Sequence, residues 1–129
     1  MNSLAKQSIS TGAVVAAIAV ALGAFGAHVL RPKLDTDAFT IFETAVRYQM
    51  YHALALILFG LATEFKSYPK IIYTLFLVGI IIFCCTLYGI VLGSLMETNP
   101  LKWLGAITPL GGIAFITAWV LFAFNSMKK

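Results

Sequence analysis

Residues 71–96 read IIYTLFLVGIIIFCCTLYGIVLGSLM, and this stretch contains no charged side chain. A helix over these residues is about 39 Å long at 1.5 Å per residue, which exceeds the hydrocarbon core of a bilayer, about 30 Å thick. A transmembrane strand is excluded, because such strands alternate in polarity over about ten positions, whereas residues 71–78 are continuously apolar. The stretch therefore predicts a membrane-spanning α-helix.

Three other stretches also lack charged side chains. They are residues 7–30, 48–63 and 103–127, and helices over them are about 36, 24 and 37 Å long. Charged residues make up 11% of the chain, against roughly 25% in soluble domains, so a soluble enzyme is excluded. The sequence predicts an all-α integral membrane four-helix bundle in one domain, residues 1–129, with spans near residues 9–30, 47–65, 70–94 and 103–125.

The net charge of +4 does not indicate a nucleic-acid-binding protein. The nine basic residues are scattered over loop and terminal positions, and no segment concentrates them. We therefore expect the lipid bilayer as partner and no nucleic acid. Cys84 and Cys85 are neighbours whose side chains point about 100° apart on a helix and cannot easily bridge. They are interpreted as small apolar residues, and we predict no metal site, cofactor or catalytic residue.

The first charge-free stretch has a second interpretation, as a cleavable signal peptide. Lys6 precedes an apolar run over residues 12–27, and Ala24 and Gly26 are the small residues that a cleavage site needs. The run is somewhat long for a signal peptide, and a single lysine precedes it. For these two reasons we expect the first helix to remain. Its removal would leave three helices with the termini on opposite sides, which reporter fusions could detect.

The second stretch is too short to span the membrane alone. Arg47 and Glu64 are separated by about 26 Å of helix. Upstream, residues 36–43 carry the capping and early acidic residues that begin a helix, so a short amphipathic extension starting near Asp37 is predicted before the second span. Glu43 and Arg47 stand at i, i+4, where an ion pair lowers the cost of an arginine near lipid. Alternatively, Arg47 extends to the headgroups without a partner.

The basic residues predict which side of the membrane holds the termini. With four spans, one side carries Lys6, Lys66, Lys70, Lys128 and Lys129, and the other carries Arg31, Lys33, Arg47 and Lys102. The bias increases if Arg47 is drawn into the bundle. By the positive-inside rule, both termini are predicted to be cytoplasmic. In a bacterium this means a multi-pass protein of the inner, cytoplasmic membrane.

Polar residues from all four helices are predicted to converge in the non-cytoplasmic half. Counted from Arg31 and Arg47 as the outer boundary, His28 is about 4.5 Å deep and His52 about 7.5 Å deep. The candidate site, either a ligand-binding site or a buried polar network, comprises His28, Glu43, Arg47, Gln49, Tyr51, His52, Tyr88 and Thr108. The inner half carries no comparable group, and polar groups at membrane depth normally face the bundle interior.

Small residues predict the packing faces. The first helix carries a small-residue ridge, at spacings that allow a close neighbour, and the third and fourth helices carry shorter ones. These positions are Gly12, Ala16, Ala19, Gly23, Ala27, Gly89, Gly93, Gly105 and Gly112. Pro109 removes a backbone donor inside the fourth stretch, so a kink or a helix start is expected near Thr108.

Four short motifs carry a resemblance to a known family. They are GAFGAH at residues 23–28, YQMYHALA at 48–55, LYG at 87–89 and ITPLGG at 107–112. In order and spacing, they resemble the motifs of the transmembrane protein 256-like family, the YgdD/YwdK type of small membrane proteins in bacteria. The resemblance extends from Gly12 to Ala123. It implies a four-span protein of unknown function, inner-membrane in bacteria, and gives no catalytic residues to transfer.

Three functions remain open at this point. The first is a structural or accessory membrane protein that packs against a larger complex and performs no catalysis. The second is a bundle that binds a lipid, a quinone or haem through His28 and His52, with Tyr88 and Arg47 assisting. The third is a small transporter or membrane enzyme. The third is disfavoured because His52 and Glu43 are about 13 Å apart along one helix.

Overall fold

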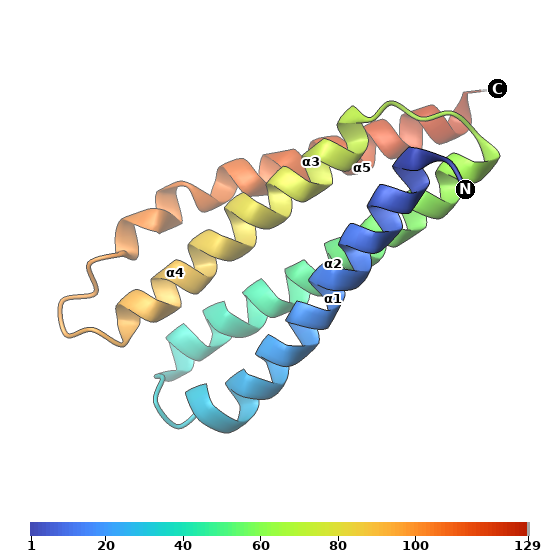
Figure 1. Ribbon diagram of the computed structural model, residues 1–129. Coiled ribbons are helices and arrows are strands. Elements are labelled where there is room, and N and C mark those ends of the chain that lie inside the picture. Colours follow the sequence, from blue (N-terminus) through green and yellow to red (C-terminus); the bar gives the residue numbers. More distant parts are fainter. Residues whose placement is uncertain (129) are drawn as a thin grey trace.

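The computed structural model describes residues 1–128 and consists of four long helical segments (Figure 1). Each segment is long and apolar enough to cross a membrane: Ser3–Leu30, Thr36–Phe65, Ile71–Ser94 and Lys102–Met127. Within the described residues no β-strand is present. The predicted all-α four-helix membrane bundle is confirmed.

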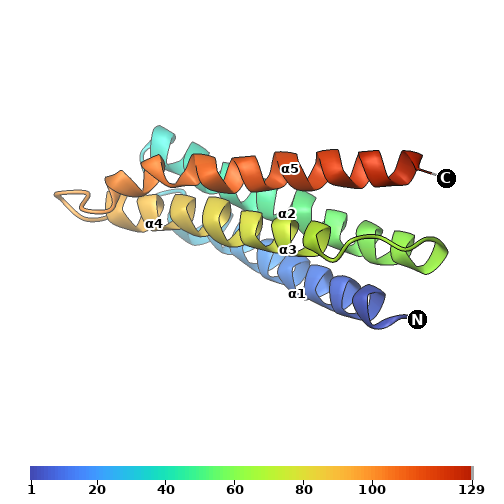
Figure 2. The same cartoon turned by 90° about the horizontal axis from the view of Figure 1, so that it is seen from above.

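The segments are divided into five α-helices and three short helical turns of other pitch. They are α1 (Ser3–Phe25), the π-turn η1 (Gly26–Leu30), α2 (Thr36–Phe65), α3 (Ile71–Gly79), the π-turn η2 (Ile80–Cys84), α4 (Cys85–Ser94), the 3₁₀-turn η3 (Lys102–Ala106) and α5 (Thr108–Met127). Helix α1 packs chiefly against α2, and α3 with η2 packs against α5. Contacts of α2 with α4 and η2 join the two pairs. Both termini lie at the same end of the bundle (Figures 1 and 2).

Helix α2 begins well before its apolar run. Asp35 is the N-cap, and its carboxylate accepts a hydrogen bond of 2.8 Å from the backbone nitrogen of Ala38. From Thr36 the helix continues without interruption to Phe65 over 30 residues. This confirms the predicted helical extension before the second span.

The predicted ridge of the first helix packs closely against α2 at its amino-terminal end. A Cβ atom on Gly12 would lie 2.6 Å from the Ala53 carbonyl oxygen, so only glycine allows this approach. Ala19 is fully buried in the same interface. Gly23 is in looser contact, with Val46 at 3.5 Å from such a Cβ, and Ala27 is exposed.

In the fourth span, the predicted packing glycines are the wrong ones. A Cβ on Gly112 would have its nearest neighbour at 4.0 Å, and one on Gly105 at 3.7 Å, so neither mediates a close approach. The close contact is made by Gly111, where a Cβ would lie 2.5 Å from the backbone nitrogen of Phe83. Spacing on a helix of uniform apolarity does not reveal which of two adjacent glycines faces the neighbouring helix.

Pro109 lies at the beginning of α5, where the missing backbone donor has no cost, because the first turn of a helix leaves its donors unbonded. The turn η3 precedes it, which agrees with the predicted helix start near Thr108. In the third span, Cys84 is buried in the core and Cys85 is exposed, and both thiols are free. The core around Cys84 is formed by aromatic and branched residues, among them Leu56, Phe59 and Phe76.

Candidate functional site

Gln49 joins three helices through the polar ends of its buried amide. Its nitrogen donates to the Val15 carbonyl of α1 at 3.0 Å, and its oxygen accepts from the Tyr88 hydroxyl of α4 at 2.7 Å. Only 5% of Gln49 is exposed. Because hydrocarbon offers no alternative partner, these bonds fix the register of α1, α2 and α4 relative to one another.

His52 joins α2 to α5 and is enclosed by aromatic rings. The indole nitrogen of Trp119 donates to Nε2 at 3.3 Å, and Nδ1 lies 2.7 Å from the Tyr48 carbonyl. Indole nitrogen can only donate, so Nε2 accepts and Nδ1 carries the proton of a neutral imidazole. The ring stacks on Phe115, with centroids 3.4 Å apart. Both nitrogens of His52 are therefore occupied by protein groups.

Two further hydroxyl pairs link helices. Thr86 and Thr108 lie 2.7 Å apart, which joins α4 to the start of α5. Thr11 and Tyr73 lie 3.2 Å apart and join α1 to α3. The second pair lies nearer the end that holds the termini. The expectation that this half carries no comparable polar group was therefore wrong.

His52 lies at the middle of α2. It stands 16 positions after Thr36 and 13 before Phe65, about 24 and 20 Å from the ends of a helix about 45 Å long. Arg47, from which its depth in the membrane is predicted, stands 11 residues after Thr36, and the predicted extension before the second span accounts for those residues.

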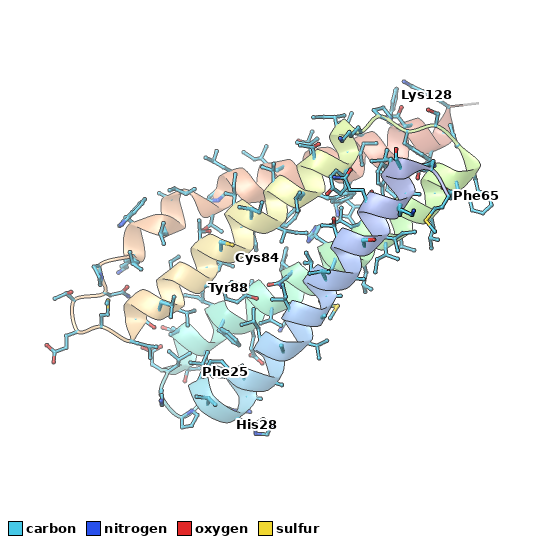
Figure 3. The ribbon with its side chains drawn as sticks, in the orientation of Figure 1. Phe25, His28, Phe65, Cys84, Tyr88 and Lys128 are labelled. Carbon is cyan, nitrogen blue, oxygen red and sulfur yellow. The ribbon has the colours of Figure 1, made fainter. Side chains whose placement is uncertain are left out.

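His28 takes no part in the buried network. It is exposed within η1 at the end of the first span, and Figure 3 shows it there, away from the interior where Tyr88 lies. His28 and His52 do not converge, so the predicted two-histidine site is absent from the described residues. One turn of π-helix, which rotates the side chains after Gly26, could not be read from the sequence.

Glu43, Arg47 and Tyr51 are exposed rather than joined to the buried network. No ion pair between Glu43 and Arg47 forms: among residues 1–128 the single charge pair within 4.0 Å joins the amino terminus to Glu64. Of the two alternatives left open for Arg47, the structure does not show the ion pair with Glu43, and Arg47 is exposed without an ion-pair partner in the described chain. These exposed residues line two grooves on the perimeter of the bundle.

The first, the arginine groove, lies between the end of the first span and the first half of α2. Its volume is about 260 Å³. Its lining consists of Gly23, Ala27, Arg31, Phe39, Phe42, Glu43, Val46 and Arg47. The guanidinium of Arg31 lies over the Phe39 ring, 5.4 Å from its centroid. The groove combines two cations, one carboxylate and small residues.

The second, the aromatic groove, lies where α2, η2 and α5 meet. Its volume is about 570 Å³. Its lining consists of Tyr48, Tyr51, His52, Phe83, Gly112, Phe115, Ile116 and Trp119. Tyr48 stacks on Phe83 with centroids 4.8 Å apart. Within the described part of the chain, neither the Tyr48 nor the Tyr51 hydroxyl has a hydrogen-bond partner.

Several partners in these networks were not anticipated from the sequence. Trp119 and Thr86 were not selected, although an indole donor and a hydroxyl within apolar runs signal a need for partners. The Val15 carbonyl belongs to the backbone, so no residue type in the sequence could indicate it as the partner of Gln49. Of the predicted set, Gln49 and Tyr88 are brought together, whereas His52 and Thr108 bond to other groups.

Four apolar helices with an internally bonded polar interior define a small polytopic membrane protein. The chain belongs to the family described as "Protein of unknown function (DUF423)", whose model matches residues 22–112. This membership confirms the resemblance noted from the four motifs.

Curated relatives are bacterial membrane proteins of nearly the same length. The UPF0382 membrane protein YwdK of Bacillus subtilis is 37% identical over 126 residues, which cover 95% of this chain and 98% of the relative. The UPF0382 membrane protein SAB0533 of Staphylococcus aureus is 39% identical over 124 residues, covering 95% and 97%. No solved structure matches the chain at a significant level.

Proposed function

We propose that this protein is a non-catalytic accessory subunit of the bacterial cytoplasmic membrane that packs laterally against other membrane proteins. The observation that carries the proposal is the internal bonding of the interior. Five buried polar side chains have a hydrogen-bond partner within the chain: Gln49, His52, Thr63, Thr86 and Thr108. Among residues 1–128 the exception is Ser8, whose buried hydroxyl has none. Polar side chains whose hydrogen-bonding atoms already have partners within the bundle favour a structural role over a chemically reactive one.

The absence of catalysis is supported by the geometry of the titratable groups. His52 uses both ring nitrogens, and it stands nine residues after Glu43, about 13 Å along the helix. A general acid and base must approach the reacting atoms within hydrogen-bond distance. His28→Ala and His52→Phe variants that abolished a measurable turnover would contradict this part of the proposal.

Lateral packing is supported by the outer face of α1. Opposite its contact with α2, this helix exposes small residues at spacings of four, four and three: Ala13, Ala17, Ala21 and Ala24. Such a ridge permits close approach of another transmembrane helix. Within the described bundle, α1 packs chiefly against α2 on its opposite face, so this ridge is left without a neighbouring helix. We expect a helix of a larger membrane assembly as the occupant.

The test is affinity purification in mild detergent with a matched pair of substitutions. Ala17→Phe fills the exposed ridge of α1, whereas Ala123→Phe adds the same bulk to an exposed position on α5. A co-purifying assembly that Ala17→Phe removes and Ala123→Phe retains would support the proposal. Recovery of the isolated chain alone, or of a homodimer unaffected by Ala17→Phe, would contradict it.

The proposed orientation places both termini in the cytoplasm. By position in the sequence, the side that holds the termini carries five basic residues, and the opposite side carries four, Arg47 included: Lys6, Lys66, Lys70, Lys128 and Lys129 against Arg31, Lys33, Arg47 and Lys102. The excess favours the cytoplasm for the first group. In a variant with Cys84 and Cys85 replaced by alanine, a membrane-impermeant maleimide should label Lys102→Cys in intact cells and leave Lys70→Cys unlabelled. The reverse pattern would overturn the orientation.

A second candidate function is binding of a lipid-soluble ring compound that carries hydrogen-bond acceptors, such as a quinone. It is supported by the aromatic groove. Tyr51 stands 15 residues after Thr36, about 22 Å along α2 and near its middle. A hydroxyl without a partner in an alkane-like medium costs about 4 kcal/mol or more. A carbonyl-bearing ring stacked among Tyr48, Tyr51 and Trp119 would supply the missing acceptors.

This version of the ligand hypothesis replaces the two-histidine one. Haem held between His28 and His52 is incompatible with the exposed position of His28, so a purified sample should lack a Soret band. Quinone retained after purification should decrease in Tyr51→Phe and remain in Tyr73→Phe, whose hydroxyl bonds to Thr11 outside the groove. Equal retention in both variants would exclude this candidate.

A further inference from the structure

The arginine groove carries charges whose partners are missing from the protein. Arg31 and Arg47 both line it, and neither lies within 4.0 Å of a carboxylate in the described chain. Glu43 lines the same groove and is likewise without an ion-pair partner there. The groove therefore presents two cations and one anion to whatever occupies it.

The depth of Arg47 makes this lack of partners significant. Arg47 follows Val46, which packs against Gly23 of the first span. Gly23 stands seven residues before Leu30, the last residue of that span, which corresponds to about 10 Å of helix. A charged side chain at this depth requires a counter-charge or a path to the headgroups.

The shape of the groove favours occupation by a single lipid molecule rather than by water. Gly23 and Ala27, which carry little or no side chain, line the groove from the first span, and Val46 and Arg47 line it from α2. At the boundary, Phe39 holds the Arg31 guanidinium against its face, which limits the rotation of that cation. We infer that the groove extends from headgroup level at Arg31, beside the α1–α2 connection, towards the acyl region at Arg47, which is the course of a bound phospholipid.

We propose that the arginine groove binds the headgroup of one ethanolamine phospholipid, in the leaflet at the α1–α2 connection. Arg31 and Arg47 bind the phosphate, for which guanidinium groups provide paired donors. Glu43 accepts from the primary ammonium, which a phosphatidylglycerol headgroup lacks. The first acyl segment lies over Gly23 and Ala27. Charge complementarity at all three positions assigns this lipid class.

The test is native mass spectrometry of the full-length chain released from nanodiscs that contain equal amounts of phosphatidylethanolamine and phosphatidylglycerol. The wild type should retain one phosphatidylethanolamine. In an Arg31→Gln/Arg47→Gln double variant, the fraction of protein that retains the lipid should decrease at least about tenfold, because the charge-assisted hydrogen bonds to the phosphate are lost. Lys102→Gln removes a cation at the same end but outside the groove and should leave retention unchanged.

Three outcomes would overturn the proposal. If the double variant retains as much lipid as the wild type, the two arginines interact only non-specifically with the headgroups of bulk lipid. Displacement of the lipid by inorganic phosphate at millimolar concentration would indicate a site for a soluble anion. Wild-type retention of phosphatidylglycerol at the same level, or a Glu43→Gln variant with unchanged lipid preference, would remove the role of the ammonium. Thermal unfolding of every variant in the same detergent separates lost binding from lost structure.

Discussion

The sharpest prediction concerns the amide of Gln49. Gln49→Leu preserves the size of the side chain but removes the hydrogen bonds to the Val15 carbonyl and the Tyr88 hydroxyl, at 3.0 and 2.7 Å. Hydrogen bonds between transmembrane helices contribute about 0.6 kcal/mol on average and up to about 1.7 kcal/mol. The free energy of unfolding should therefore decrease by about 1–3 kcal/mol.

The measurement is reversible unfolding in mixed micelles, titrated with a denaturing detergent and followed by tryptophan fluorescence. Tyr88→Phe removes one of the two bonds and should cost about half as much. The double variant, Gln49→Leu/Tyr88→Phe, should cost less than the two single changes together, because both remove the same bond. Thr117→Val serves as the control, since its exposed hydroxyl bonds only to the Ile113 carbonyl of its own helix.

The reasoning is refuted if the losses of unfolding free energy in Gln49→Leu and Tyr88→Phe simply add up in the double variant. If the coupling energy between Gln49 and Tyr88 is zero, the 2.7 Å contact does not stabilise the bundle. If Gln49→Leu is neutral or stabilising, polar bonding does not hold α1, α2 and α4 together, and apolar packing alone does. Either result would remove the observation on which the accessory-protein proposal rests.

Two further predictions use the same unfolding measurement. Gly111→Ala places a Cβ 2.5 Å from the Phe83 backbone nitrogen and should cost about 1–3 kcal/mol, whereas Gly112→Ala meets nothing nearer than 4.0 Å and should be neutral or slightly stabilising. Trp119→Phe leaves Nε2 of His52 without its donor and should cost about 1 kcal/mol. Equal effects at the two glycines, or a stabilised Trp119→Phe variant, would contradict the helix placement.

The fold was predictable because the bilayer imposes it. A chain with 11% charged residues has few places for loops, and the helices must fill the stretches between them. The start of α2 was predictable for a local reason, since Asp35 and the residues after it carry capping chemistry that acts over a few positions. Both signals are contained in short windows of sequence.

The candidate site was predictable only in part, because its geometry depends on rotation and depth. The first span is apolar on all sides, so the sequence carries no amphipathic pattern that could orient His28. Depth depends on where the membrane boundary falls along α2, and the helix itself continues through that boundary because it begins 11 residues before Arg47. The pairing of His52 with Trp119 spans 67 positions and leaves no local trace.

The arrangement of bonded and unbonded polar groups moves the search for function from the interior to the perimeter. Gln49 and His52 looked functional because polar groups in apolar helices are rare, yet both are fully occupied by their own chain. Arg47 and Tyr51 lack protein partners and face outward within the described structure. Among the buried side-chain atoms described, only Ser8 Oγ and Asn99 Oδ1 lack a hydrogen-bond partner. A bundle that bonds most of its buried polar groups internally and leaves Arg47 and Tyr51 open towards lipid supports the proposals in which the perimeter, rather than the interior, binds a molecule in the plane of the membrane.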